Sequence, residues 1–231
     1  MFVHLKTKTI YSLLEGAIFA KGLADQCCKF KMPAVGIADR ANLFGALEFS
    51  EVLSDNGIQP IIGCQLPISF EEADIKKLRA TDRISMLFLA KNELGYRNLM
   101  ELSSKFFLND TYRFEGMSIQ EIDKFSDGLI CLSGGDESPI NNLLKDNKID
   151  EAKNFLLHFK RTFGDRFYLE LNRHPLGDNY SKKVNIEDNI LDLADKQNLP
   201  LVATNDAYFL EKELYQPVSY THLTLPTKRI V

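Results

Sequence analysis

The sequence predicts an α/β fold, an irregular seven-stranded (β/α)7 barrel whose strands are mostly parallel. Short apolar, strand-like runs alternate with helix-like runs along almost the whole chain of 231 residues, and seven strand-like runs can be counted. This alternation favours right-handed crossovers and a parallel sheet. Seven units fit a barrel better than an open doubly wound sheet, although the pattern alone leaves both arrangements open.

Each predicted strand is a short apolar run bounded by polar or turn-forming residues. The third run is extended but interrupted by Pro60 and Pro67. The polar stretches at residues 71–82 and 109–118 are expected to be surface insertions. The seven strands are predicted at residues 2–5, 34–38, 59–70, 84–90, 129–132, 167–171 and 201–203.

Apolar residues at spacings of three and four predict helices between these strands. Asn42 and Asn92 stand at the starts of two helices and are expected to be N-caps, and Gly57 is expected to end the first of the two. The predicted helices cover residues 18–32, 42–56, 92–108, 149–163 and 186–198.

The composition argues against several classes of protein. The net charge is −4 and no stretch is strongly basic, so the segment is not expected to grip a nucleic-acid backbone by itself. The first residues lack the apolar region of a signal peptide, and the longest apolar run, residues 86–90, is too short to span a membrane. Four cysteines without a C-x-x-C pair favour buried, reduced thiols in a cytoplasmic protein.

Polar residues follow six of the seven predicted strands, and Glu170 lies inside the sixth. Ligands of barrels and open α/β sheets bind at the carboxyl ends of the strands, so this rim is the expected functional site. Its candidate residues are Lys6, Lys8, Asp39, Arg40, Gln65, Ser133, Gly134, Gly135, Asn172, Arg173, His174, Asn205 and Asp206.

The chemistry of the rim is unusual for a metal site. Lys6, Lys8 and Arg40 are protonated cations that repel a metal ion. The side chains of a usable ligand type are Asp39, His174 and Asp206, with His4 and Glu170 as weaker candidates. Lys6 and Lys8 alternate on one strand and therefore share a face, which could also be a solvated edge.

Six motifs follow one another along the chain: residues 4–17 (HLKTKTIYSLLEGA), 37–45 (IADRANLFG), 63–65 (GCQ), 128–134 (GLICLSG), 168–174 (YLELNRH) and 203–210 (ATNDAYFL). In this order they resemble the PHP (polymerase and histidinol phosphatase) domain of the large, α, subunits of bacterial DNA polymerase III. A seventh stretch, residues 89–103 (LAKNELGYRNLMELS), resembles the polymerase form of this domain rather than free-standing PHP phosphatases.

The resemblance implies a PHP domain over residues 1–216, incomplete at its C-terminal end. Residues 217–231 depart from the family pattern and resemble a translated sequencing-adapter tail, so we leave them, with His222, out of the site.

The resemblance also implies that a metal site has been altered. Metal-binding relatives have histidine where this chain has Lys6, Lys8 and Arg40, and a carboxylate where it has Gln65. Gly135 and Tyr208 replace a cysteine and a further histidine, whereas the ligand types at Asp39, His174 and Asp206 are kept.

We therefore expect an ion-pair network of Lys6, Lys8, Arg40, Asp39 and Asp206 in place of the metals, because buried acids need compensation. The domain would then bind no metal and be non-catalytic. Three alternatives remain open: an active PHP phosphoesterase or 3′–5′ exonuclease, a binding site for an anion such as pyrophosphate, and a barrel enzyme that uses Lys6 or Lys8 as base or nucleophile.

Partners also follow from the resemblance. It implies that a proofreading exonuclease subunit docks on this domain and that further domains of the same polymerase chain contact it. Nucleotidyl transfer, with its Mg²⁺ ions, would take place on a palm domain outside this segment. Contact with DNA would likewise run through those other domains, and the location would be cytoplasmic.

Overall fold

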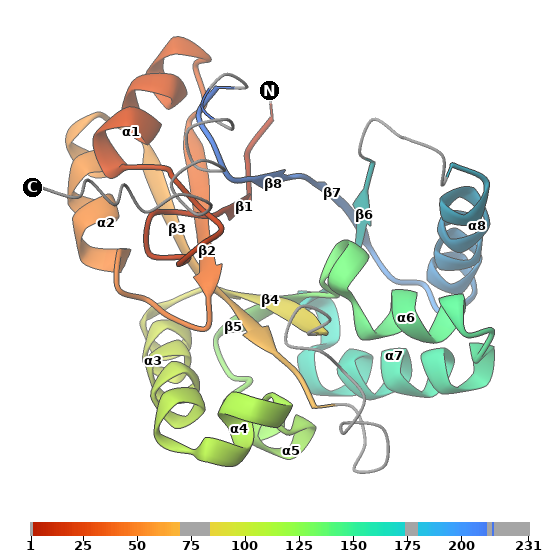
Figure 1. The fold of residues 1–231 in the computed structure, drawn as a ribbon. Coiled ribbons are helices and arrows are strands. Elements are labelled where there is room, and N and C mark those ends of the chain that lie inside the picture. Colours follow the sequence, from red (N-terminus) through yellow and green to blue (C-terminus); the bar gives the residue numbers. More distant parts are fainter. Residues whose placement is uncertain (1, 70–83, 174–179, 212–213, 215–231) are drawn as a thin grey trace, which may run out of the picture.

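One curved sheet of eight strands organises the protein, which we describe from a computed structural model (Figure 1). The described residues are 2–69, 84–173, 180–211 and 214, and the side chains of residues 180–185 are not described. The strands are β1 (Lys6–Thr7), β2 (Ala34–Arg40), β3 (Gln59–Pro67), β4 (Ser85–Ala90), β5 (Leu129–Leu132), β6 (Phe167–Asn172), β7 (Leu201–Thr204) and β8 (Asp206–Ala207).

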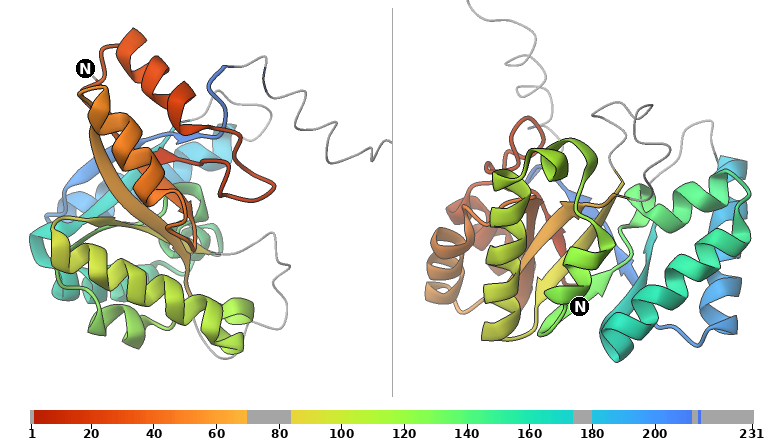
Figure 2. Two further views of the ribbon diagram at one scale, coloured as in Figure 1. Left: turned by 90° about the vertical axis from the view of Figure 1, so that its left-hand side faces the viewer. Right: turned by 90° about the horizontal axis from the view of Figure 1, so that it is seen from below.

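Helices follow most strands and cover the outer face of the sheet, as two further views show (Figure 2). None of the helices in the described part of the chain is long and apolar enough to cross a membrane. The helices are α1 (Ala20–Lys29), α2 (Ala46–Asp55), α3 (Glu93–Leu108), α4 (Asp110–Glu115), α5 (Ile119–Lys124), α6 (Pro139–Lys145), α7 (Ile149–Phe163) and α8 (Tyr180–Lys196), with single 3₁₀ turns η2 (Gly135–Glu137) and η3 (Gly164–Arg166).

The sheet is nearly closed into a barrel. Its strand order is β7-β6-β5-β4-β3-β2-β1-β8, so β7 and β8, which are separated only by Asn205, form its two edges. All neighbouring strands are parallel except that β4 is antiparallel to both β3 and β5. The mostly parallel barrel expected from the sequence is confirmed, with β8 as a short additional strand.

Three apolar clusters hold this arrangement together. The largest packs α3, α5, α6, α7 and α8 against the outer face of β3 to β6 and contains Phe159, Phe163 and Phe167. A second lies under α1 and α2. A third, small cluster fills the inside of the barrel with Ala38, Leu87, Leu89 and Leu132 at its centre. The inside is thus apolar at one end of the barrel, and polar side chains occupy the end toward the carboxyl ends of β2 and β3.

Several predicted elements match the structure and others are corrected. The strands at 129–132 and 84–90 and the helices at 92–108 and 149–163 agree to within a residue. The first strand lies later than predicted, at Lys6–Thr7, because its partners β2 and β8 pair with the lysine-rich segment rather than with residues 2–5. Helices α4, α5 and α6 were not predicted, since six or seven residues are too few to show a helical period.

Of the two asparagines predicted as N-caps, only one caps a helix. Asn92 is the N-cap of α3, and its side chain accepts a hydrogen bond from the backbone N–H of Gly95 at 3.0 Å. Asn42 is not a cap, because α2 begins only after Gly45. It instead ties the loop together by donating to the carbonyls of Tyr11 and Arg40, both at 3.0 Å. The predicted insertion at 71–82 lies outside the described residues.

The cysteines are free thiols, as the sequence predicts. Cys27, Cys64 and Cys131 are buried, and burial raises the pKa of the Cys64 thiol to about 12. Cys28 is exposed, which corrects the expectation that all four are buried.

We predict that Gly95→Ala destabilises the protein. A Cβ at Gly95 would lie 1.9 Å from the backbone oxygen of Gly128, which cannot move without displacing β5. The expected cost is about 1–3 kcal/mol in urea unfolding, or more if β5 shifts. Gly22→Ala in α1 is the matched control: its Cβ meets only the tip of the Leu210 side chain, so helix propensity should make it neutral or stabilising. Equal effects of the two substitutions would contradict this account.

Candidate functional site

Strand alternation decides which side chains enter the barrel. Ala38 of β2, Leu87 of β4 and Leu132 of β5 point inward and form the apolar level. Two residues further toward the rim, the same face of β2 carries Arg40, and the same face of antiparallel β4 carries Ser85. Arg40 and Ser85 therefore lie on the rim side of the apolar side chains.

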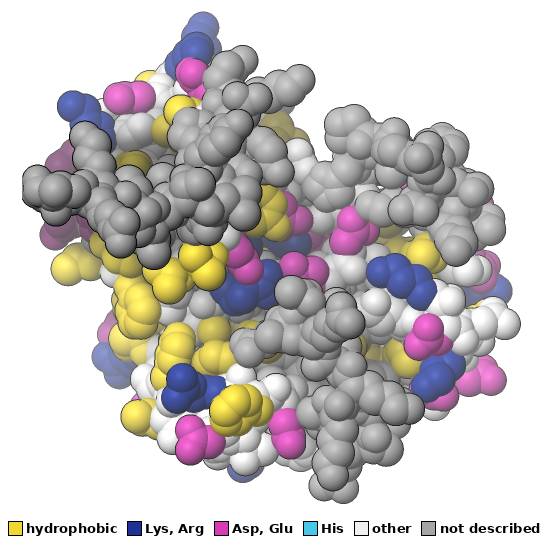
Figure 3. Space-filling view, viewed as in Figure 1, with side chains coloured by type: hydrophobic (Ala, Val, Ile, Leu, Met, Phe, Trp, Pro, Cys, Tyr) yellow, Lys and Arg dark blue, Asp and Glu magenta, His cyan; other side chains and the backbone are white. Residues whose placement is uncertain are grey.

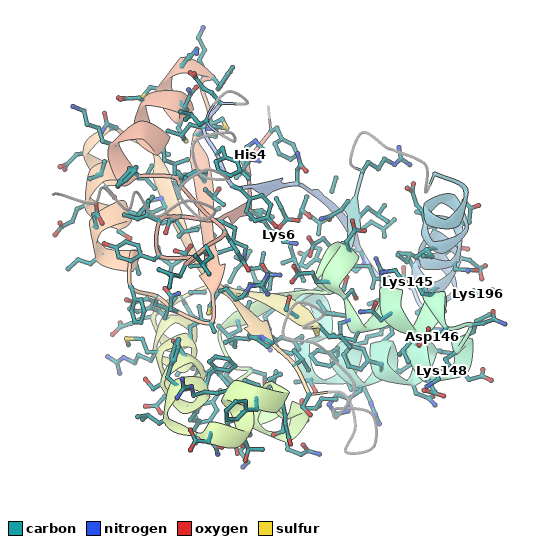
Figure 4. The ribbon with its side chains drawn as sticks, in the orientation of Figure 1. His4, Lys6, Lys145, Asp146, Lys148 and Lys196 are labelled. Atoms are coloured by element: carbon teal, nitrogen blue, oxygen red, sulfur yellow. The ribbon has the colours of Figure 1, made fainter. Side chains whose placement is uncertain are left out.

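Lys6 forms the centre of the first of two ion-pair clusters among the polar side chains of the barrel. Its ammonium group lies 3.0 Å from Oε1 of Glu170 in β6 and 3.2 Å from Oδ1 of Asp206 in β8. Lys6 and Glu170 are each 1 % exposed, and Lys6 lies in the space that the sheet encloses (Figure 4). Burial alone would lower the pKa of Lys6, but the two carboxylates outweigh it and raise the pKa above its usual value.

The two carboxylates of this cluster are fixed from other directions. Glu170 accepts a hydrogen bond from the backbone N–H of Gly134 at 3.1 Å and contacts the hydroxyl of Thr204. Asn172 donates to Asp206 Oδ2 at 3.2 Å, and the Thr204 hydroxyl donates to Asn172 Oδ1 at 2.7 Å. The two carboxylate groups that face Lys6 are therefore also held in place by contacts with other residues.

Arg40 forms a second cluster at the mouth of the barrel. Its Nε donates to Glu15 at 2.8 Å, and its two terminal nitrogens bind both oxygens of Glu137 at 3.2 and 3.0 Å. Such a bidentate pair is the strongest form of a carboxylate contact. Burial raises the pKa of Glu137, but Arg40 and then Ser85 lower it by more, so Glu137 is held as a carboxylate.

Lys8 lies between the two clusters and is fully buried. Its ammonium group donates to the carbonyl oxygen of Ala38 at 2.6 Å and to the side-chain oxygen of Gln65. Both acceptors are uncharged. Burial, followed by repulsion from Arg40 and Lys6, lowers the pKa of Lys8 to about 8.

Gln65 links Lys8 to the carboxylate of the second cluster. Its oxygen accepts from Lys8, while its nitrogen donates to Ser85 at 2.7 Å and to Glu137 at 2.9 Å. A glutamate here could accept from Lys8 but could not donate to Glu137, so the amide fits this position on both sides.

Asp39 stands apart from the cations with which the sequence predicted it to pair. It follows Ala38 and precedes Arg40, so it points to the other face of β2. It accepts hydrogen bonds from the backbone and hydroxyl of Thr9 at 2.7 and 2.6 Å and from the hydroxyl of Ser12 at 2.6 Å. Asp39 thus anchors the loop after β1, and the observed partners of Lys6 and Arg40 are other carboxylates.

The remaining candidates are divided between the rim and its surroundings. The Ser133 hydroxyl contacts none of these cations. It accepts a hydrogen bond from the backbone N–H of Glu170 at 3.0 Å. Arg173 is exposed and binds Glu187 of α8. His4 lies before β1, level with Gly36, with its ring 4.8 Å from that of Phe2 (Figure 4). His174 and His222 lie outside the described residues.

Three residues of the site were not singled out from the sequence. Glu137 and Glu15 hold Arg40, and Ser85 holds Glu137. Glu15 lies in the loop after β1 and Glu137 in the 3₁₀ turn η2 after β5, so an acid near a strand end was their only signal. Ser85 begins the antiparallel strand β4, and its inward position depends on that strand's direction, which periodicity does not give.

The described rim does not fit a metal ion. No group of three or more His, Cys, Asp or Glu side chains with metal-binding geometry occurs among the described residues. The ammonium of Lys6 lies between the carboxylates of Glu170 and Asp206, where a cation would otherwise be held. A metal ion there would meet a positive charge at contact distance and would be repelled.

The geometry also disfavours the phosphate-binding alternative. Lys6 and Arg40 each contact two carboxylates already, and Lys8 is buried against uncharged oxygens. An anion at the rim would have to displace a carboxylate from its cation.

Lys6→Met is expected to destabilise the protein by about 3–5 kcal/mol, because it leaves Glu170 and Asp206 buried without their cation. Urea unfolding at pH 7 measures this. Lys196→Met is the matched control: its ion pair with Asp192, at 2.6 Å, is exposed and should contribute less than about 1 kcal/mol. Adding Glu170→Gln and Asp206→Asn to Lys6→Met should recover part of the loss, and no recovery would contradict a role for charge compensation.

Lys8 gives the stability a dependence on pH with a defined sign. Its folded pKa of about 8 lies below the unfolded value of 10.5, so within this window the unfolded chain binds more protons and stability rises with pH. Relative to Lys8→Met, the unmodified protein should gain up to roughly 3 kcal/mol across the window.

Urea unfolding of both proteins at several pH values measures this gain. Groups common to both proteins cancel in the difference. Lys21→Met, at an exposed position of α1, should leave the pH dependence unchanged. Parallel pH curves for the unmodified protein and Lys8→Met would refute the effect.

Solved structures share this fold at low sequence identity. An amidohydrolase from Chromobacterium violaceum superposes with a TM-score of 0.54 at 10% identity over 89% of this chain and 87% of its own. A protein described as a metal-dependent phosphoesterase from Bifidobacterium adolescentis gives 0.51 at 13% identity over 91% of this chain and 88% of its own. At these identities the likeness shows the fold alone.

Curated relatives are much closer in sequence. DNA polymerase III subunit alpha of Caulobacter vibrioides is 43% identical over 215 residues, which are 93% of this chain and 18% of the relative. The protein of the same name from Borreliella burgdorferi is 34% identical over 92% of this chain and 18% of its own length. The chain thus spans about a fifth of these relatives. The profile of the PHP domain family matches residues 4–174, and the chain belongs to this family.

Proposed function

We propose that this chain is a non-catalytic PHP domain of a replicative DNA polymerase and serves as a structural scaffold. The observation that carries the proposal is the place of Lys6, between Glu170 and Asp206 inside the barrel. A protein cation there supplies the charge that a metal would supply, but it cannot activate water or polarise a phosphoryl group. Similarity to the α subunits of DNA polymerase III supports the polymerase as the parent protein.

The same ion pairs favour a role in rigidity. Lys6 belongs to β1 and Glu170 to β6, which lie near opposite ends of the strand order. The pair therefore bridges the incomplete seam of the barrel. A barrel tied across its seam offers a firm platform to neighbouring domains, which is what a scaffold requires.

The proposal includes partners that lie outside the described residues. Nucleotidyl transfer and its Mg²⁺ ions belong to a palm domain elsewhere in the polymerase, and DNA is contacted through such domains, in the cytoplasm. A proofreading exonuclease subunit docks on the PHP domain, and co-elution of the purified proteins in size-exclusion chromatography measures that contact.

The non-catalytic role predicts the metal content of the purified protein. After exposure to Zn²⁺, Mn²⁺ and Fe²⁺ and removal of free ions, elemental analysis should find far less than one metal ion per chain. EDTA should leave the melting temperature unchanged, because no metal contributes to folding. Phosphoesterase activity on a chromogenic ester should stay at background. Stoichiometric metal together with EDTA-sensitive hydrolysis would overturn the proposal and favour an active PHP phosphoesterase.

A further inference from the structure

Large apolar side chains are exposed on the loops beside the rim. They come from the loop after β1, the loop between β2 and α2, the start of α2 and the end of α3. Space-filling representation shows hydrophobic side chains gathered over the loop before α2 and over α3 (Figure 3). The members of this surface, here named the rim patch, are Leu13, Leu14, Phe44, Leu47, Phe107 and Leu108.

Hydrogen bonds and a ring contact join the segments of the rim patch. The loop after β1 is fixed to α2, because the Tyr11 hydroxyl donates to Glu48 at 2.9 Å. The loop before α2 is fixed to α3 by two contacts. The Phe44 ring stacks on the Phe107 ring with 6.1 Å between the ring centroids, and the Ser103 hydroxyl donates a hydrogen bond to the Ala41 carbonyl at 2.9 Å. The segments that carry the exposed side chains are therefore joined to one another, and the rings of Phe44 and Phe107 are in contact.

The exposure of the rim patch is large. Leu108 is 86 % exposed, Leu13 82 % and Leu47 70 %. Scattered apolar side chains are normal on a protein surface, but a continuous group of them marks a contact site. Such a surface carries no charge of its own, so its partner must present apolar side chains in return.

Leu14 gives a second and independent sign of function. Its backbone has a positive φ of 66° and the side chain is 73 % exposed. A leucine is strained in this region, and surrounding contacts must hold it there. Gly16 shows how tightly the loop is packed, since a Cβ at that position would lie 2.2 Å from the Thr9 carbonyl oxygen. The loop thus holds Leu14 in a strained backbone conformation with its apolar side chain exposed to solvent.

The position of the rim patch connects it to the ion pairs. Leu14 directly precedes Glu15, which binds Arg40 at 2.8 Å. The side chains of Arg40, Glu15 and Glu137 remain 22 %, 31 % and 35 % exposed. A partner seated on the rim patch would exclude water from this cluster and strengthen its electrostatic contacts.

We propose that the rim patch is covered by another domain of the same polymerase polypeptide. The proposal rests on the function proposed above and goes beyond it by assigning the surface. The matched segment makes up only 18% of the Caulobacter and Borreliella relatives, so most of such a chain lies elsewhere. A strongly apolar contact is typical of permanent interfaces, as between domains of one chain, rather than of partners that exchange.

Thiol labelling of the full-length polymerase chain that carries this segment tests the proposal. Leu47→Cys and Leu108→Cys are introduced separately in a Cys28→Ser background, because Cys28 is exposed. Ile149→Cys is the matched control, since this aliphatic position on α7 is 47 % exposed and lies outside the rim patch. Maleimide reaction rates are measured in native and urea-unfolded protein. We expect both patch thiols to react at least about tenfold more slowly than the control in the native chain, corresponding to about 1.4 kcal/mol of protection.

Other occupants give different outcomes, and each overturns the proposal. Patch thiols that react as fast as the control thiol show an uncovered surface. Protection that appears only when the exonuclease subunit is added assigns the surface to that subunit. Protection that disappears on dilution assigns it to a second copy of the chain. The proposed non-catalytic function fails by a separate measurement, metal content and hydrolysis, so the two failures can be told apart.

Discussion

The ion pairs of Lys6 with Glu170 and Asp206 are the contact on which the rest of the rim depends. They join β1 and β8, at one end of the strand order, to β6 near the other end. Hydrogen bonds along the strands cannot make this connection, because the sheet is not fully closed. Removing water from two carboxylates and an ammonium is costly, and only their mutual contact offsets that cost. The fold and the charge pattern are therefore coupled: a barrel of this curvature brings the acids together, and the lysine makes their proximity tolerable.

A second constraint is the alternation of side chains along each strand. It directs Lys6, Lys8, Arg40 and Gln65 into the barrel and sends Asp39 to the other face of β2. Two cations acquire carboxylate partners, whereas Lys8 is held by uncharged oxygens and titrates nearer neutrality. The amide of Gln65 satisfies both Lys8 and Glu137, which a carboxylate could not do. The three cations and the amide thus form one mutually consistent set of side chains.

The rim also relates chemistry to assembly. Its deep part is closed by protein cations, while its outer part, around Arg40, remains partly hydrated and is bordered by the rim patch. A surface of this kind suits a domain whose role is contact rather than turnover. The mouth that would admit a substrate to a catalytic barrel is here framed by exposed leucine and phenylalanine side chains.

The sequence by itself determined the fold class, most strand positions, the Asn92 cap and the fact that cations stand among acids at the strand ends, because these depend on periodicity, local hydrogen bonds and residue type. Tertiary structure alone decided the pairing. Glu15 and Glu137 are separated from Arg40 along the sequence, in a loop and in a 3₁₀ turn. The inward position of Ser85 depends on the antiparallel direction of β4. Residue type predicts Asp39 as a partner of the cations, but its position on the other face of β2 directs it to Thr9 and Ser12 instead. Which charges meet is settled by barrel curvature and strand direction, since these bring together residues that are up to 200 positions apart, as Lys6 and Asp206 are.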